Sequence, residues 1–263
     1  MNRNDLCKLI AEATYSIVGF DAGEKFTSGS AVAFNSQGDL LTAAHVITNR
    51  LPIKNEDVND PNCTWIAKAK TGRHYEYKPL LCGIAAQNEY LREPLTVDLA
   101  VLRCLEKRSD VAYLPLSSSG IKIGDEVLMS GFPDEMELPF KFDQAFNYSH
   151  PEIRDHKGML LKALDLTRRL LMIKAGMIGN STRFEFIDGD NCIQGEFFYV
   201  DNAMHSGASG GPVINGKGEV VGIITLRAVT DASTGEIRRL EIPSGSTVAV
   251  TSQTIARYIP KTV

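Results

Sequence analysis

Short apolar segments separated by turn residues run through most of this chain, and they constrain its fold more than any other feature. Each segment is too short for a typical helix, and most are rich in β-branched or aromatic residues, which favours strands. The predicted strands are residues 15–20, 30–34, 40–44, 75–81, 99–104, 126–130, 172–178, 197–200, 212–214, 220–226 and 246–251. The sequences Asn-Ser-Gln-Gly at 35–38 and Asn-Gly-Lys-Gly at 215–218 predict hairpin turns. Many short strands at close spacing favour sandwiches or barrels over a parallel α/β sheet.

Two short helices are predicted near the ends of the chain. Residues 4–13 carry apolar side chains at helical spacing, and Asn4 is the expected N-cap. Residues 252–258 have a helical pattern as well, with Ser252 as the expected N-cap. The predicted class is therefore all-β with a short helix at each end.

We expect a single domain over residues 1–263, built from two strand-rich halves. A small polar stretch at 117–120 separates residues 1–116 from residues 117–263. Residues 134–169 differ from their surroundings, because they contain prolines, several charges and a pattern that fits an amphipathic helix or a strand. We therefore predict that this segment is an insertion in the second half.

The charge balance and the cysteines exclude several classes of function. There are 28 Lys and Arg residues against 32 Asp and Glu residues, and no basic run has interleaved aromatics, so nucleic-acid binding is not expected. The N-terminus lacks the apolar stretch of a secretory signal, and no segment of about 18 apolar residues could span a membrane. The cysteines lack the spacing of a disulfide framework or a zinc site, which predicts reduced thiols and a cytoplasmic protein without a metal or cofactor. These cysteines are Cys7, Cys63, Cys82, Cys104 and Cys192.

The strongest chemical signal is the sequence Gly-Ala-Ser-Gly-Gly-Pro-Val at 207–213. Glycines beside Ser209 let a reacting carbonyl approach the backbone, and they let amides turn towards an oxyanion. A Gly/Ser-rich turn without chemistry would look similar. A nucleophile elbow of the α/β-hydrolase kind requires a histidine after the serine, but the last histidine in the chain is His205. The elbow is therefore excluded.

Two further residues complete a His-Asp-Ser order along the chain. His45 follows the apolar segment 40–44, and we expect it at the end of a strand. Asp98 stands at the start of the apolar segment 99–104, where a buried carboxylate could hold an imidazole in one tautomer. Each residue alone would more often be structural, but together with Ser209 they agree in type, order and spacing.

At residues 28–227 the chain resembles the trypsin/chymotrypsin superfamily, and within it the HtrA-like (Deg) protease domains. The resemblance is carried by the sequences at 28–32 and 38–46, by Asp-Leu-Ala-Val-Leu at 98–102, by Gly-Phe-Pro at 131–133 and by the segments 201–215 and 222–225. It implies two six-stranded antiparallel Greek-key β-barrels of the chymotrypsin kind. The family usually appends a PDZ domain, but we expect none here because the sequence ends at Val263, and we expect no activation by a new N-terminus of the zymogen kind.

The resemblance also assigns roles to individual residues. It implies that Ser209 is the nucleophile, His45 the general base and later acid, and Asp98 the residue that orients His45. It implies that the backbone amides of Gly207 and Ser209 form the oxyanion hole. Secreted trypsins usually carry cysteines where this chain has Val46 and His205, which agrees with a reducing compartment.

The resemblance further implies where the primary specificity pocket lies. The residues that correspond to it are Ala203, Met204, His205, Thr225, Leu226 and Arg227. Ala203 stands where a trypsin carries an acid, so Lys or Arg at P1, the residue on the acyl side of the scissile bond, would have no partner. We expect small or medium apolar P1 residues, with Arg227 narrowing the pocket or attracting an acidic neighbour.

Several alternatives stay open at this point. The chain could be a latent or inactive trypsin-like scaffold that acts as a binding or sensor module, or a protease activated by a regulatory protein partner. A serine esterase would share the chemistry with another acyl pocket. Clustered polar residues at 150–156 (His150, Glu152, Asp155 and His156) match no metal-ligand spacing and predict a solvated loop, and Cys192 is expected to be a buried, inert thiol. The sequence does not predict an oligomeric state.

Overall fold

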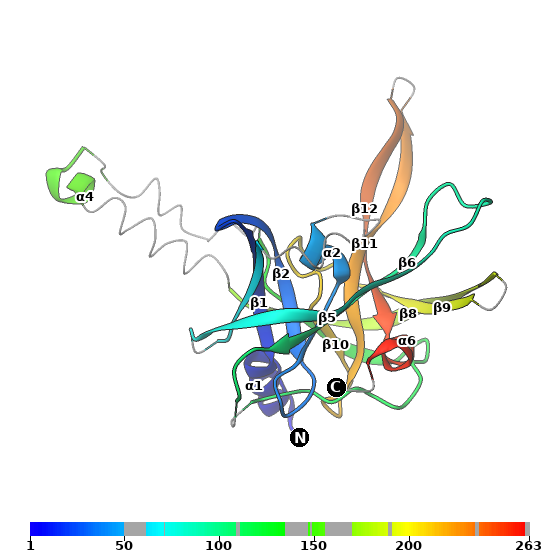
Figure 1. Ribbon diagram of the computed structural model, residues 1–263, viewed down its shortest axis with the longest axis horizontal. Coiled ribbons are helices and arrows are strands. Elements are labelled where there is room, and N and C mark those ends of the chain that lie inside the picture. The colour runs from blue at the N-terminus through cyan, green and yellow to red at the C-terminus, as the bar shows by residue number, and fades with distance from the viewer. Residues whose placement is uncertain are drawn as a thin grey trace.

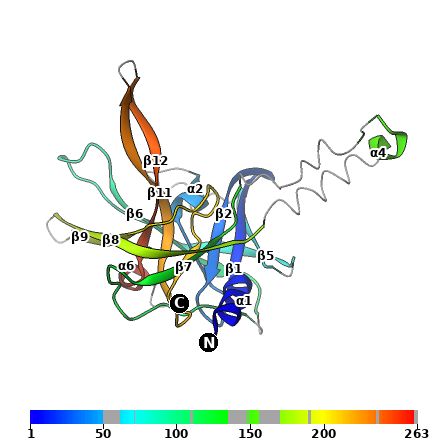
Figure 2. The ribbon, with the colours of Figure 1, turned by 180° about the vertical axis from the view of Figure 1, so that it is seen from behind.

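The computed structural model describes residues 1–49, 62–70, 72–108, 111–134, 147, 149–155, 170–188, 191–234 and 237–260. Its described strands form two closed antiparallel barrels of six strands each (Figures 1 and 2). The first barrel has the order β1-β2-β3-β6-β5-β4 and contains β1 (Thr14–Asp21), β2 (Glu24–Ala33), β3 (Leu40–Thr42), β4 (Cys63–Lys68), β5 (His74–Ala86) and β6 (Leu95–Cys104). The second has the order β10-β11-β12-β9-β8-β7 and contains β7 (Glu126–Gly131), β8 (Met172–Asp188), β9 (Asn191–Val200), β10 (Pro212–Ile214), β11 (Val220–Thr234) and β12 (Ile237–Thr251). The predicted all-β, two-barrel fold is confirmed.

The strands differ from the predicted segments in one omission and in their length. β4 was not predicted, because in Cys63–Lys68 only Trp65 and Ala67 are buried, and polar residues flank them. β11 and β12 extend well beyond the predicted segments, since they continue as a hairpin that projects from the barrel (Figure 1). The side chains that are described in these arms, at 226–230 and 243–246, are exposed or only partly buried, so they lack the alternating pattern from which a strand is predicted.

Both terminal helices form, and each takes its N-cap one or two residues earlier than predicted. Helix α1 (Arg3–Ala13) begins after Asn2, whose side chain accepts a hydrogen bond from the Asp5 amide at 2.9 Å. Helix α6 (Ser252–Tyr258) begins after Thr251, whose hydroxyl accepts from the Thr254 amide at 3.2 Å. The predicted caps Asn4 and Ser252 are therefore wrong, and both residues lie inside their helices.

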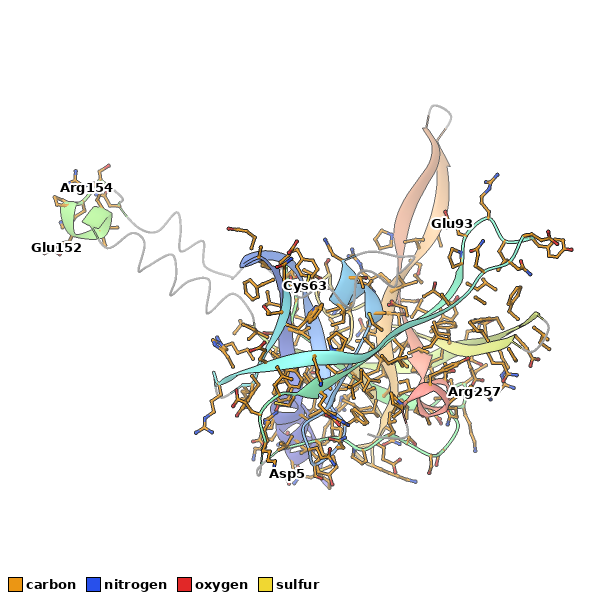
Figure 3. All side chains as sticks on the ribbon, in the orientation of Figure 1. Asp5, Cys63, Glu93, Glu152, Arg154 and Arg257 are labelled. Carbon is orange, nitrogen blue, oxygen red and sulfur yellow. The ribbon has the colours of Figure 1, made fainter. Side chains whose placement is uncertain are left out.

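The hydrophobic core consists of one buried cluster in each barrel and a third that joins them. Ile17, Leu40 and Trp65 belong to the first barrel's cluster, whereas Met129 and Phe198 belong to the second barrel's. The third cluster takes residues from both barrels and from α1 and α6. The side chains fill the two barrels and the space between them (Figure 3). The two barrels are therefore packed face to face, and the residues between them have fixed positions.

Within the predicted insertion at 134–169, the described residues contain one short helix, α4 (Pro151–Asp155). The helix or strand predicted further along this segment lies outside the described residues. None of the described helices is long and apolar enough to cross a membrane.

Candidate active site

His45 lies on a short helix rather than at a strand end. β3 stops at Thr42, and α2 (Ala44–Thr48) starts two residues later, so the prediction that His45 ends a strand is wrong. The helix is a single turn, closed by a hydrogen bond of 2.7 Å from the Asn49 amide to the His45 carbonyl. Asn49 has a positive φ of 58°, which ends the helix. A helix this short has no periodic pattern, so the sequence could not show it.

Asp98 binds His45 through both of its carboxylate oxygens. Asp98 lies in β6, paired between β5 and β3, and its side chain is buried. Its Oδ2 lies 2.7 Å from His45 Nδ1, and its Oδ1 accepts a hydrogen bond of 2.9 Å from the His45 backbone amide. Because an ionised carboxylate can only accept, Nδ1 carries the proton and Nε2 is left as an acceptor. The pair therefore fixes the position, the orientation and the tautomer of the imidazole.

Ser209 faces the same cleft as His45, although the two side chains are not hydrogen-bonded. Both residues line a cleft of about 320 Å³. In the described structure the Ser209 hydroxyl donates to the Thr225 carbonyl at 3.5 Å and makes no hydrogen bond to the imidazole. The structure thus brings the three predicted residues together, with the His45–Asp98 contact formed and the Ser209–His45 contact open.

Glycine is required beside Ser209 because the loop is pressed against the first barrel. Gly210 has a φ of +83°, and a Cβ there would lie 2.0 Å from Thr42 Oγ1 and 2.1 Å from the Ser30 carbonyl oxygen. The Ser30 amide in turn donates to the Ser209 carbonyl at 2.9 Å. The nucleophile loop of the second barrel is therefore shaped on the surface of the first.

The peptide between Ser206 and Gly207 is held in one orientation. The Ser206 carbonyl accepts a hydrogen bond of 2.9 Å from the Asp134 amide. In a trans peptide the N–H points away from the C=O, so the Gly207 N–H points away from Asp134. In the part of the chain that the structure describes, the amides of Gly207 and Ser209 donate to no protein group, and both residues line the cleft. Two unused donors beside a serine hydroxyl are the elements of an oxyanion-binding site.

Sequence reasoning missed two residues that hold this loop. The Ser30 hydroxyl is fully buried, donates to the Gly207 carbonyl at 2.8 Å and accepts from the Phe132 amide at 2.8 Å. Asp134 supplies the amide that binds Ser206. Ser30 lies inside one of the segments that carried the family resemblance and Asp134 directly follows another, but their contacts join positions that are far apart in the chain. No local pattern could indicate them.

The six predicted specificity residues lie on two neighbouring segments. Thr225, Leu226 and Arg227 are on β11, where Thr225 is buried and the other two are exposed. Ala203, Met204 and His205 are in the loop after β9, where Met204 is buried and His205 is exposed. Thr247 of β12 connects the two segments. It is the register partner of Arg227 in β11, and its hydroxyl donates to the Asn202 carbonyl and accepts from the Met204 amide, each at 2.8 Å.

Lys174 brings a cation to these segments, which the sequence did not predict. Its ammonium group donates to the Ala203 carbonyl at 2.7 Å, and the residue is half-buried on β8. Lys174 is 29 positions away from Ala203, so only the fold brings them together.

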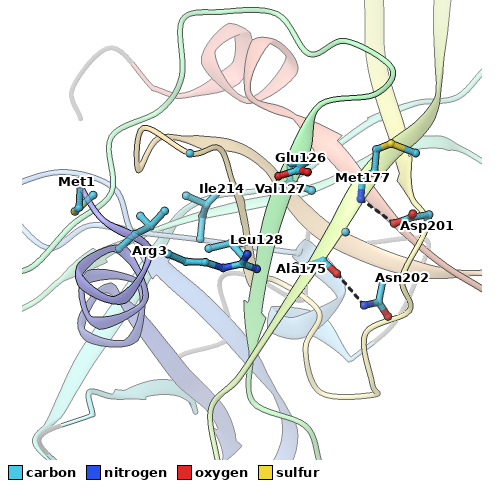
Figure 4. Close-up of a pocket in the computed structure, with 13 residues that line it drawn as sticks. Met1, Arg3, Glu126, Val127, Leu128, Ala175, Met177, Asp201, Asn202 and Ile214 are labelled. Carbon is cyan, nitrogen blue, oxygen red and sulfur yellow. Dashed lines mark hydrogen bonds between the residues drawn. The ribbon is translucent and has the colours of Figure 1, made fainter.

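The remaining candidates form no site within the part of the chain that the structure describes. Among the described residues no group of His, Cys, Asp and Glu could hold a metal, and His156 lies outside them. Cys192 is exposed, so the expectation of a buried thiol is wrong; it lies on the β8–β9 hairpin, which is open to solvent. A larger cavity of about 630 Å³ lies between the start of α1 and strands β7 and β8 and contains none of the predicted site residues (Figure 4).

Comparison with known proteins identifies the family and agrees with the fold. A family model described as a trypsin-like peptidase domain matches residues 29–223. Among solved structures, the Rv3671c protease from M. tuberculosis in its active form is similar, with a TM-score of 0.56 and 13% sequence identity over 97% of this chain and 82% of that chain. At this identity the likeness shows the fold alone. No curated protein matches the chain.

Proposed function

The chain belongs to the trypsin-like peptidase family, since the family model covers most of its length, and on this premise we propose that it is a serine endopeptidase. The proposed catalytic residues are Ser209, His45 and Asp98, and the proposed oxyanion hole consists of the Gly207 and Ser209 amides. The observation that carries the proposal is the single cleft in which Ser209 faces an imidazole whose Nδ1 is bound by Asp98.

The proposed reaction uses these groups in two steps. His45 Nε2 takes the Ser209 proton as Oγ attacks the scissile carbonyl carbon, and the two amides bind the oxyanion. The imidazolium, stabilised by Asp98, then protonates the departing amine and leaves an acyl-enzyme. Water, deprotonated by the same imidazole, releases the acid in the second step. The Ser209 hydroxyl has to leave the Thr225 carbonyl and turn towards His45 before the first step.

An open strand edge supports a peptide substrate. Beyond Ile224, no described strand pairs with β11 on the edge opposite β12. An extended peptide can add to such an edge through its backbone, which an ester substrate does not require. This edge starts at Thr225, next to Ser209. We therefore favour peptide bonds over esters, and protein or peptide substrates.

The proposed P1 preference excludes positive charge. None of the six predicted pocket residues has a carboxylate, and the Lys174 ammonium beside Ala203 would repel Lys or Arg. Small or medium apolar P1 residues remain our proposal. Strong cleavage after Lys or Arg, with none after Val, Leu or Ala, would overturn it.

Covalent labelling with a fluorophosphonate probe tests the proposal. We expect wild type and Ser206→Ala to be labelled, and Ser209→Ala and His45→Ala to remain unlabelled. Ser206 is a matched control because it lines the same cleft. Labelling of Ser209→Ala at the wild-type rate would exclude Ser209 as the nucleophile.

A second candidate function rests on the open contact between Ser209 and His45. A latent protease, activated by a regulatory partner, or a scaffold used only for binding would show the hydroxyl on Thr225, as observed. Folded wild type that is labelled only in cell lysate would favour the latent, HtrA-like enzyme, and no labelling under either condition would favour the binding scaffold.

Cys7, Cys104 and Cys192 are free thiols, so we propose a cytoplasmic location for either function.

A further inference from the structure

The cleft at Ser209 has a second wall on the side of the leaving group. It contains none of the six residues predicted for the P1 side. Its walls come instead from the start of β2, from α2 and from Asp134 after β7. A peptide bound along β11 would direct the residues after its scissile bond, P1′ and P2′, into this space.

Asp134 presents to this cleft a carboxylate that pairs with no cation among the described residues. Its amide is fixed on the Ser206 carbonyl, and its Oδ2 accepts a hydrogen bond of 3.4 Å from the Ser28 hydroxyl. A Cβ built on Gly207 would lie 2.7 Å from the Asp134 carboxyl carbon, so the carboxylate stands beside Gly207 in the nucleophile loop. Within the described residues Asp134 forms no ion pair, and the carboxylate is exposed.

Among the described residues of the cleft wall, Lys25 is the other permanently charged one, and it lies further out. It precedes Ser28 by three positions on β2, and strands rise by about 3.3 Å per residue, so the two residues are roughly 10 Å apart along the strand. A peptide that runs beside β2 therefore meets Asp134 close to the scissile bond and Lys25 about three residues later.

We propose that Asp134 is a specificity-determining residue that selects Lys or Arg at P1′ or P2′. This inference rests on the proposed endopeptidase function. A cationic side chain there gains a carboxylate that Ser28 already orients, and an acidic side chain is repelled. For a pair at an exposed site the expected preference is about three- to fivefold. The carboxylate also disfavours the oxyanion, but that effect is common to all substrates and cancels in a ratio.

Cleavage-site profiling of a peptide library by mass spectrometry tests the proposal. For wild type we expect Lys and Arg to be enriched over Asp and Glu at P1′ and P2′ by about three- to fivefold. Asp134→Asn abolishes the enrichment and Asp134→Lys reverses it. Asp125→Asn, at an exposed aspartate whose carboxylate accepts a hydrogen bond from the Lys122 amide, keeps it. Identical profiles for wild type and Asp134→Asn would overturn the proposal.

A binding measurement tests the charge selection by Asp134 without catalytic turnover. In a Ser209→Ala background, a peptide with Lys at P1′ and P2′ should bind about threefold more tightly than its Glu analogue, and Asp134→Asn should equalise the two. Equal binding in the presence of Asp134 would refute the charge selection. Labelling of Ser209 by the fluorophosphonate reports on the triad separately, because the probe has no peptide on the leaving-group side. A failure of the endopeptidase proposal is thereby distinguished from a failure of this one.

Discussion

Replacing Asp98 by Asn should stop the chemistry while leaving the fold in place. Both carboxylate oxygens are in use, one by the His45 backbone amide and the other by Nδ1. An amide side chain has one oxygen, and the backbone N–H can only donate, so the oxygen stays there and the NH₂ group faces Nδ1. The imidazole must then accept at Nδ1 and carry its proton on Nε2. In that tautomer it has no acceptor for the Ser209 proton.

The expected loss is about 10⁴-fold in rate, the size seen when a serine protease loses the correct tautomer. That corresponds to about 5 kcal/mol of transition-state stabilisation. Stability should fall by only about 1.5–3 kcal/mol, the worth of one hydrogen bond to a charged group. The fluorophosphonate labelling rate and the urea unfolding curve of the same preparation measure the two quantities.

Asp39→Asn is the matched control because it should have the opposite effect. Asp39 is equally buried in the first barrel, but it pairs with Arg103 at 3.3 Å and contacts no cleft residue. Because the Arg103 side chain is 30% exposed, losing this pair should cost about 2–3 kcal/mol, below the roughly 3–5 kcal/mol of a fully buried pair, yet the protein that remains folded should be labelled at the wild-type rate. The reasoning is refuted if Asp98→Asn is labelled within tenfold of wild type, or if folded Asp39→Asn is not labelled.

Three further predictions concern the loop and its support. Gly210→Ala should lower the free energy of unfolding by about 2–5 kcal/mol, because φ is positive there and the new Cβ would overlap with backbone atoms. Gly124→Ala, at a φ of +95° in open space, should lower it by only about 1–2 kcal/mol. Equal losses in urea unfolding would contradict this prediction. Ser30→Ala should slow labelling by about tenfold, less than the 10²–10³ of a lost oxyanion donor, because it only positions Gly207; an unchanged labelling rate would contradict it. The hydrogen bond from Asn215 lowers the pKa of Glu219, so the stabilising effect of the ionised Glu219 is present at neutral pH and is lost as the pH falls through that lowered pKa. Glu219→Gln should therefore be less stable than wild type at pH 7, and the difference should vanish in acid. A stability difference that does not depend on pH in urea titrations would count against this prediction.

Burial explains why the sequence predicted most of the barrel strands. In β7 every residue but Glu126 is buried, and in β10 every residue is buried, so both strands contain short apolar runs that can be recognised in the sequence. The pattern fails where that cause is absent. The outer parts of β11 and β12 project from the barrel, and α2 has only 5 residues, too few for a helical pattern to repeat.

The candidate site could be predicted only as far as its chemistry imposes residue types and their order. His45, Asp98 and Ser209 were indicated because a nucleophile, a base and an orienting acid each need particular side chains. Ser30 and Asp134 act through a hydroxyl and a backbone amide, which many other residues could supply in another fold. Their partners are 177 and 72 positions away, since Ser30 binds Gly207 and Asp134 binds Ser206. Such contacts are a property of the packed barrels.

The dependence of the site on both barrels follows from which groups hold the nucleophile loop. Ser30 binds that loop twice, through its amide to the Ser209 carbonyl and through its hydroxyl to the Gly207 carbonyl. Gly210 packs against Thr42, so the loop has no room to relax towards the first barrel. His45 and Asp98 also belong to the first barrel, whereas the two unused amides belong to the second. A change in how the barrels dock would therefore alter two things together, the distance from Ser209 to His45 and the orientation of the proposed oxyanion donors. A regulator that acts on one contact between the barrels would thus control both that distance and that orientation.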